Sequence, residues 1–239
     1  MQLSLMTFTP ASSESVIAFL GICYFVVIFY LYCTFAAEKE LGGDAGKRVA
    51  LFSFLLSVWI AVLWFVVRSK LLLAHTIPAL PLLFLFMNGC ALAYGLSTLG
   101  KRLSLATPIW ALVGFQIFRL PLELVLHSWA EQGTIPGTMT WTGQNLDILT
   151  GITALVCAPF AVRSRKAAWV ANLAGISLLL NVMRVAVMSS PLPFAWPVTQ
   201  GLHPPLLLAM VFPYALIVPL CVGAALAGHV ILTRALLRR

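Results

Sequence analysis

Polar side chains recur at helical spacing inside a stretch of the chain that is otherwise apolar enough to cross a membrane. At about 100° per residue they fall within roughly 80° of one another on a helix, and the other faces of that helix carry Leu, Val, Ile and Phe. An ionisable side chain in a membrane-spanning helix is costly, so it is expected to face the protein interior. The first candidates for a functional site are therefore Gln116, Arg119, Glu123 and His127.

These residue types combine an anion-binding group with groups that transfer protons. The guanidinium of Arg119 can hold a phosphate or a carboxylate through two parallel hydrogen bonds. Glu123 lies one helical turn away, close enough to pair with Arg119, and Pro121 between them loosens the helix and frees a backbone carbonyl. Histidine changes charge near neutral pH, which makes His127 the best suited of these residues for proton transfer.

Two further polar residues, Asn145 and Asp147, precede the next apolar run. They could belong to the same site, with Asp147 as a third candidate for proton transfer. They could equally be the N-cap and the first-turn acid of a helix, where a carboxylate complements the helix dipole. The preceding residues 139–143 are rich in hydroxyl groups and aromatic rings, which could fold over a ligand or rest at the lipid interface.

A second arginine occurs in the run 167–190, where Asn181 and Arg184 share one helical face and the run itself offers no carboxylate. Together, Arg119 and Arg184 could hold one anion, with His203 close by at the start of the last run. Alternatively, the two arginines neutralise the carboxylates in a purely structural network, since charges within a membrane usually pair. The sequence leaves both interpretations open.

The composition places these residues in a membrane protein. Of 239 residues, 61% are hydrophobic and 9% charged, which excludes an ordinary soluble domain and makes membrane lipids the expected partners. The formal net charge of +8 does not indicate nucleic-acid binding, because the basic residues occur in twos and threes between apolar runs. The five cysteines lie in apolar runs without metal-type spacing, which predicts buried reduced thiols.

Seven apolar runs are long enough to cross a membrane. We therefore expect an all-α, polytopic fold with a single transmembrane domain over residues 1–239 and no sizeable extramembrane domain. Pro213 and Pro219 interrupt the last of the runs. The runs cover residues 16–35, 49–67, 77–99, 103–127, 145–162, 167–190 and 204–232.

Positive charge alternates between the connecting segments. One alternate set, residues 38–48, 101–102, 163–166 and the C-terminal end, holds eleven of the fifteen Lys and Arg, whereas the other set holds only Arg68 and Lys70. The positive-inside rule then predicts a multi-pass inner-membrane protein with its C-terminus in the cytoplasm and its N-terminus outside. This orientation places nearly all the polar residues in the outer half of the membrane and predicts an outward-facing polar pocket.

The histidines raise the question of a metal or haem. His75, His127 and His203 are all expected near the outer face, and imidazole is a common ligand of zinc, copper and haem iron. A short ligand spacing such as His-x-x-x-His is missing, and isolated histidines at membrane boundaries are usually hydrogen-bonded amphipathic residues. We therefore assign no metal ligands from the sequence, and the cofactor stays unknown.

Residues 118–127 read Phe-Arg-Leu-Pro-Leu-Glu-Leu-Val-Leu-His and are followed by Ile-Pro at 135–136, Met-Thr at 139–140 and Gly-Gln-Asn-Leu-Asp-Ile at 143–148. This pattern resembles a family of uncharacterised bacterial polytopic membrane proteins with an Arg-x-x-x-Glu helix followed by Ile-Pro, Met-Thr and Gly-x-Asn-x-Asp-Ile motifs. The resemblance covers the middle of the chain and implies no known activity. It includes the residues that depth and helical facing single out.

The stretch Asn181-Val-Met-Arg184-Val, with Cys157 before it and His203 after it, is similar to the Asn-x-x-Arg stretch of exosortases and archaeosortases. These are membrane transpeptidases that use a Cys, an Arg and a His from successive helices at the outer face. Their cysteine stands in a Cys-Ser-Gly context, whereas Ala158 follows Cys157 here. Counted from Asn145, Cys157 would lie roughly 18 Å deep, where a thiolate is costly to form.

The sequence thus favours a pocket that binds a small anionic group or the head of a lipid-linked molecule that enters between helices. In this hypothesis the ligand-binding residues are Gln116, Arg119, Asn145, Asn181, Arg184 and His203, and the proton-transfer residues are Glu123, His127 and Asp147. A transpeptidase, a haem or metal protein, a transporter and a membrane assembly protein are the alternatives. A transporter needs a continuous polar path, and the cytoplasmic half offers little polar lining beyond His229.

Overall fold

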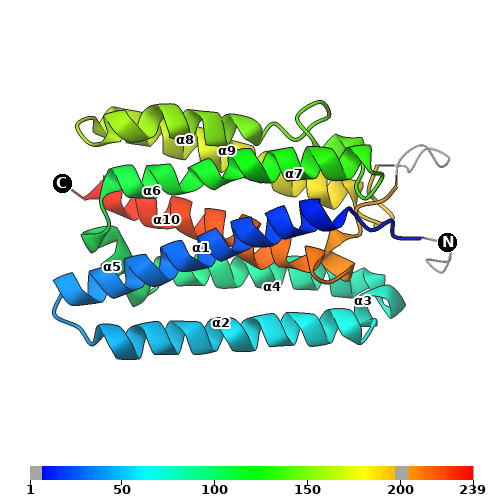
Figure 1. Ribbon diagram of the computed structural model, residues 1–239, viewed down its shortest axis with the longest axis horizontal. Helices are drawn as coiled ribbons and strands as arrows, with labels where there is room; N and C mark the ends of the chain where they lie inside the picture. Colours follow the sequence, from blue (N-terminus) through cyan, green and yellow to red (C-terminus); the bar gives the residue numbers. More distant parts are fainter. Residues whose placement is uncertain (1–6, 197–203, 239) are drawn as a thin grey trace.

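The computed structural model describes residues 7–196 and 204–238, and this part of the chain is helical and without strands. Six of its helices are long and apolar enough to cross a membrane, as expected of a multi-pass membrane protein, and they lie side by side along the long axis of the molecule (Figure 1). These helices are α1 (Ser13–Glu40), α2 (Ala45–Arg68), α4 (Thr76–Leu96), the combined segment Ile109–Glu131, α9 (Arg165–Ser189) and the combined segment Tyr214–Leu237.

The remaining apolar run forms a shorter helix than the sequence predicts. Helix α8 (Ile148–Ala161) has 14 residues, because residues 140–147 fold as turns ahead of it. Helix α8 packs most extensively against α9, with which it forms an antiparallel pair (Figure 1). The turn that precedes α8 therefore lies within the bundle, where the sequence predicts the first residues of the helix, and its Asn145 and Asp147 are buried.

Two other expected runs are broken. The run that begins near residue 103 starts with a separate short helix, α5 (Thr98–Ala106), because extended backbone at Thr107 and Pro108 ends it before α6 (Ile109–Phe115). The last run begins with two 3-10 turns, η4 (Leu208–Met210) and η5 (Tyr214–Leu216), followed by η6 (Ile217–Gly223) and α10 (Ala224–Leu237).

Element η6 is a π-helical segment within the last crossing. Pro219 has no backbone N–H, so the regular ladder of α-helical hydrogen bonds cannot pass through it, and wider turns take its place. The interruption that Pro213 and Pro219 predict from the sequence is therefore confirmed, and it shapes the wall of the cavity described below.

The helices at the centre of the bundle are the most buried, and those at its periphery are the least buried. Helix α10 packs against α4, α5, α6 and α9, and much of its surface is buried. Close approach depends on glycine: a Cβ at Gly175 of α9 would meet the ring of His229 on α10, and one at Gly228 would meet Gln116 and Phe115. At the periphery, Leu63 is the only buried residue of α2. The exposed side chains of this helix are largely apolar, as expected for a helix that faces lipid.

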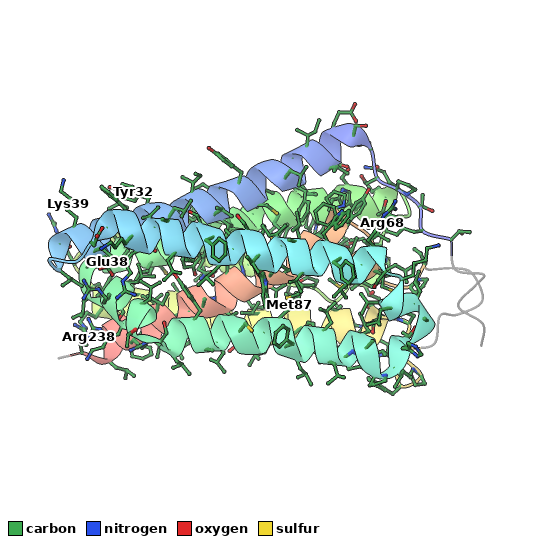
Figure 2. All side chains as sticks on the ribbon, turned by 90° about the horizontal axis from the view of Figure 1, so that it is seen from below. Tyr32, Glu38, Lys39, Arg68, Met87 and Arg238 are labelled. Carbon is green, nitrogen blue, oxygen red and sulfur yellow. The ribbon has the colours of Figure 1, made fainter. Side chains whose placement is uncertain are left out.

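The basic connecting segments gather at one end of the bundle, where Figure 2 places Glu38, Lys39 and Arg238, while Arg68 lies at the other end. Glu38 is buried and accepts two hydrogen bonds from Arg102, at 2.7 and 2.9 Å. Arg234 donates to the carbonyls at the end of α4, where a cation complements the helix dipole. Ion pairing and helix capping thus hold this end together.

Candidate functional site

The predicted polar stripe lies on a helix with a tighter turn in its middle. Between α6 and α7 (Arg119–Glu131), residues Gln116–Phe118 form the 3-10 turn η2. Pro121 cannot donate a hydrogen bond to the carbonyl of Ile117 one α-helical turn earlier, which favours the tighter turn at this point. Gln116, Arg119 and Glu123 are all buried as predicted for a stripe that faces the protein interior.

Arg119 forms a buried ion pair with Asp147, which stands at the N-cap position of α8. Nη1 of Arg119 donates to Oδ1 of Asp147 at 2.5 Å, and the hydroxyl of Thr150 donates to the same oxygen at 2.8 Å. Arg119 therefore pairs with a carboxylate from the next helix, and not with Glu123 one turn above it on its own helix. The Asp147 side chain does not cap α8, so its main role is the ion pair.

Asn145 connects the two carboxylates and is completely buried. Its side-chain carbonyl accepts from the backbone N–H of Asp147 at 3.1 Å, and its amide donates to the carbonyl of Met139 at 3.1 Å. Because that N–H can only donate and that carbonyl can only accept, the orientation of the Asn145 amide is fixed. The same amide also donates to Oε1 of Glu123 at 2.9 Å, so Oε1 acts as an acceptor.

Glu123 and Arg119 keep hydrogen-bonding capacity beyond these contacts. Oε2 of Glu123 is buried and has no hydrogen-bond partner among the described residues. Within the same part of the chain, the guanidinium of Arg119 donates one hydrogen bond, to Asp147, although a guanidinium carries five N–H donors. Both side chains line a cavity, so the unused groups of this site border space that a ligand could occupy.

The cavity has a volume of about 340 Å³ and lies between α4, α7, α9, η6 and the segment that leads into η6. Apart from one polar end formed by Arg119, Glu123 and Asp147, its walls are almost entirely apolar side chains. Leu85 of α4 and Phe194 line it and are 66% and 60% exposed, so it reaches the outer surface of the bundle beside α4. Representative lining residues are Leu80, Phe84, Leu126, Val182, Ala186 and Val218.

Arg184 does not join Arg119. Its side chain is exposed, donates to Asn181 at 3.0 Å and to Gln144 at 3.3 Å, and lies 5.6 Å from the centre of the Trp196 ring. Neither Arg184 nor Asn181 lines the cavity, so in this structure the two guanidiniums are not arranged as one anion clamp. The amide of Asn181 donates to the backbone carbonyl of Gln144, which ties α9 to the turn ahead of Asn145.

The predicted histidines are not grouped either. The ring of His127 stacks on Trp141 at 4.2 Å between centroids, and its Nε2 lies 3.7 Å from a carboxylate oxygen of Glu131. His203 lies outside the described residues. Within the described ranges, no group of three or more His, Cys, Asp or Glu side chains is arranged to hold a metal ion.

Gln116 donates a hydrogen bond to the carbonyl of Ala225 at 3.4 Å.

A second buried polar cluster lies between α9 and α10, and the sequence analysis identified only one member of it. Thr233 donates to the carbonyl of His229, so it accepts from the amide of Asn172 at 2.7 Å. The carbonyl oxygen of Asn172 then faces Nδ1 of His229 at 2.9 Å, which makes Nδ1 the protonated ring nitrogen. The spacing of His229 and Thr233, one helical turn apart, was the available signal.

The five cysteines are all free. Cys23, Cys33 and Cys221 are buried as predicted, whereas Cys90 and Cys157 are only partly buried. Cys157, the cysteine of the transpeptidase-like pattern, lies in α8 and does not line the cavity. Cys221 of η6 does line it. At the main site, sequence reasoning missed Thr150, whose hydroxyl bonds Asp147. Trp141, whose ring stacks on His127, belongs to the stretch 139–143 that the sequence singles out for its aromatic rings.

Comparison with known proteins finds no matching family model, no matching curated protein and no matching solved structure.

Proposed function

We propose that this multi-pass membrane protein binds an amphipathic, lipid-type anion. The apolar chain of the ligand occupies the cavity beside α4, and its anionic head meets Arg119. The observation that carries the proposal is a buried guanidinium with unused donors at the one polar end of an otherwise apolar cavity. A cavity of this volume, mostly apolar with few convergent polar groups, is typical of small-molecule sites.

The buried guanidinium of Arg119 supports an anionic head group. This side chain is 2% exposed, and one of its N–H groups is used by Asp147. Charge-assisted hydrogen bonds to phosphate or sulfate oxygens are stronger than bonds between neutral groups, and a guanidinium offers them in a planar, paired arrangement. An anionic oxygen in the cavity would therefore satisfy donors for which the described residues provide no acceptor.

The walls of the cavity and its opening beside α4 both support an apolar chain in the ligand. Side chains of α4, α7, α9, η6 and the segment before η6 give the cavity apolar walls. A small water-soluble anion would make no apolar contact with these walls and would leave most of the cavity empty. Because Leu85 and Phe194 are both cavity-lining and exposed, a chain can reach the cavity from the surrounding lipid. Access through the side of the bundle fits a lipid-type molecule better than a free ion.

The orientation follows from the charges. We propose that the basic end of the bundle faces the cytoplasm and that the protein resides in the inner membrane, because eleven Lys and Arg belong to the segments at that end. The ion pair of Arg119 then lies near the middle of the membrane, because Arg119 stands close to the midpoint of the crossing Ile109–Glu131. A reporter enzyme that works only in the cytoplasm should be active when it is fused after residue 239. Activity of a periplasm-specific reporter at the same position would reverse the orientation.

A set of single-chain lipids with one acyl chain and different heads tests the proposed function. Purified protein in nanodiscs of zwitterionic lipid should bind radiolabelled lysophosphatidylglycerol in a saturable way. Unlabelled monoacylglycerol, which has no charge, should displace it about tenfold less well or worse, because it lacks the charge-assisted bond to Arg119. Equal displacement by the neutral lipid would contradict an anion site.

A matched pair of variants locates the binding. Ala186→Phe places a large ring in the cavity without touching any charged group and should abolish binding. Leu173→Phe introduces the same ring on the lipid-exposed face of the same helix, α9, and should leave binding unchanged. If the folded Ala186→Phe protein binds as well as the Leu173→Phe protein, the ligand does not use this cavity.

A further inference from the structure

We infer that the anion binds together with one proton, which is carried on Oε2 of Glu123. This inference rests on the proposed function, since it concerns the chemistry of the same cavity. It assigns Glu123 a specific task, which is to match the charge of the ligand and to donate a hydrogen bond to it. The ligand class is then an amphipathic anion whose affinity is linked to proton uptake.

The first step is the charge of the site. Arg119 and Asp147 neutralise each other in their ion pair, so an ionised Glu123 gives the polar end of the cavity a net charge of −1. An anionic head would raise this to −2 within apolar walls, where unbalanced charge is strongly disfavoured. Uptake of one proton on Glu123 returns the total to −1. Anion and proton therefore favour each other's binding.

The second step is the position of the proton. Asn145 is held in one orientation by the backbone N–H of Asp147 and the carbonyl of Met139, and its amide donates to Oε1 of Glu123. An oxygen that already accepts from this amide is a poor place for a further proton. Oε2 has no partner among the described residues and is the oxygen available to carry it. Since Glu123 lines the cavity, an O–H group there can donate to the ligand.

The third step is the pairing of donors. Arg119 and Glu123 lie one turn apart on α7, and both line the cavity. With Glu123 protonated, its O–H and the unused N–H groups of Arg119 form a set of donors that suits the several oxygens of a phosphodiester. With Glu123 ionised, the same oxygen would repel the head. Protonation thus converts a repulsive contact into a hydrogen bond.

Few other titratable groups surround Glu123. The cavity-lining residues of α4 and α9 include none, and Cys23 of α1 lies next to Cys221. His127, one turn further along α7, stacks on Trp141 and approaches Glu131. The titratable or charged groups near the site are Arg119 on the same helix, Asp147 at the start of α8, Cys221 of η6, Cys23 of α1, His127 and Glu131 on α7, and His229 of α10, whose ring lies beside Thr150.

The test measures affinity against pH with a probe whose own charge is constant. A lysophosphatidylglycerol phosphodiester keeps one negative charge from about pH 5 to about pH 10, unlike a phosphate monoester, which titrates near neutral pH, so the affinity can be followed into the alkaline range. In the range where Glu123 is ionised in the free protein, the affinity of the wild type should rise about tenfold for each unit by which the pH falls. Inorganic sulfate should not compete; if it does, the site takes free anions and not lipid heads.

Glu123→Gln is the decisive variant, because the glutamine amide donates permanently where the protonated carboxyl donates only at low pH. It should bind the probe with an affinity that no longer changes with pH. Glu131→Gln removes an exposed carboxylate from the same helix and should keep the wild-type slope. Calorimetry of the wild type in two buffers of different ionisation enthalpy, at an alkaline pH where Glu123 is ionised in the free protein, should show about one proton taken up per ligand bound.

The outcomes separate the two proposals. If the probe does not bind the wild type at any pH, the proposed function fails. If the probe binds but with a flat pH dependence or without proton uptake, or if Glu123→Gln keeps the wild-type slope, the coupled proton fails while the anion site stands.

Discussion

Replacing Arg119 by methionine should lower the free energy of unfolding by about 3–5 kcal/mol, because the change leaves the carboxylate of Asp147 buried without its cation. Asp147→Leu should be destabilising to a similar extent for the reciprocal reason. The cost comes from the unpaired charge, and not from a large intrinsic contribution of the pair. Chemical or thermal unfolding of the purified variants in one detergent measures it.

The double variant Arg119→Met with Asp147→Leu distinguishes this explanation from simple loss of packing. With both charges gone, its stability should return to within about 1–2 kcal/mol of the wild type, since apolar replacements of buried ion pairs are often neutral. Arg184→Met is the matched control, because Arg184 is exposed and should change stability by less than about 1 kcal/mol. A double variant as unstable as either single variant would contradict the account.

The same double variant tests function separately from folding. Because it lacks the cation of the cavity, it should fold and yet lose its preference for lysophosphatidylglycerol over the neutral monoacylglycerol. A folded double variant that keeps the preference would place the anion elsewhere.

Asn145→Leu should reduce stability by at least about 3 kcal/mol. The change leaves the backbone N–H of Asp147, the carbonyl of Met139 and Oε1 of Glu123 without their bonds to this side chain, and each buried group left unsatisfied costs about 1–3 kcal/mol. The turn ahead of α8 should also loosen, because the bond from Asn145 to Glu123 helps to join it to α7. Hydrogen exchange of the backbone amides around Asp147 would detect this loosening.

Two controls accompany this variant. Gln144→Leu alters the neighbouring residue, which is exposed, and should cost less than about 1 kcal/mol. Asn145→Asp keeps the shape but replaces a donating amide with a third carboxylate, so it should be as damaging as Asn145→Leu. If Asn145→Asp were as stable as the wild type, the assigned orientation of the amide would be wrong.

The apolar runs and the polar stripe could be predicted from the sequence because both depend on local spacing. Burial of Gln116, Arg119 and Glu123 follows from the cost of exposing such groups to lipid, whichever fold surrounds them. The interruption at Pro213 and Pro219 was likewise predictable, since proline removes a hydrogen-bond donor wherever it stands.

The partners within the site could not be predicted in the same way. Spacing along one helix made Glu123 the obvious partner of Arg119, but the turn ahead of α8 enters the bundle and brings Asp147 closer. Arg184 and Asn181 share a face of α9 as expected, yet that face contacts Gln144 and not the cavity. Which element a helical face meets is decided by tertiary packing, which helical periodicity does not encode.

The cavity itself was also beyond sequence reasoning. Its walls are ordinary apolar residues of α4, α9 and the segment before η6, and nothing in their types distinguishes them from the core. The π-helical segment η6, which packs against α4, and the 3-10 turn η4 before it form one wall. The sequence therefore predicted the polar end of the site but not the apolar space in front of it.

The central claim is that a lipid-type anion lies in this cavity with its head at Arg119 and Glu123. The most direct measurement is photo-crosslinking with a lysophosphatidylglycerol analogue that carries a diazirine at the end of its acyl chain, followed by mass spectrometry of the labelled peptides. The account predicts labelling of cavity-lining residues such as Phe84, Ala186 and Val218, lost on addition of unlabelled ligand. Labelling confined to lipid-exposed residues such as Phe54 of α2, unchanged by unlabelled ligand, would contradict it.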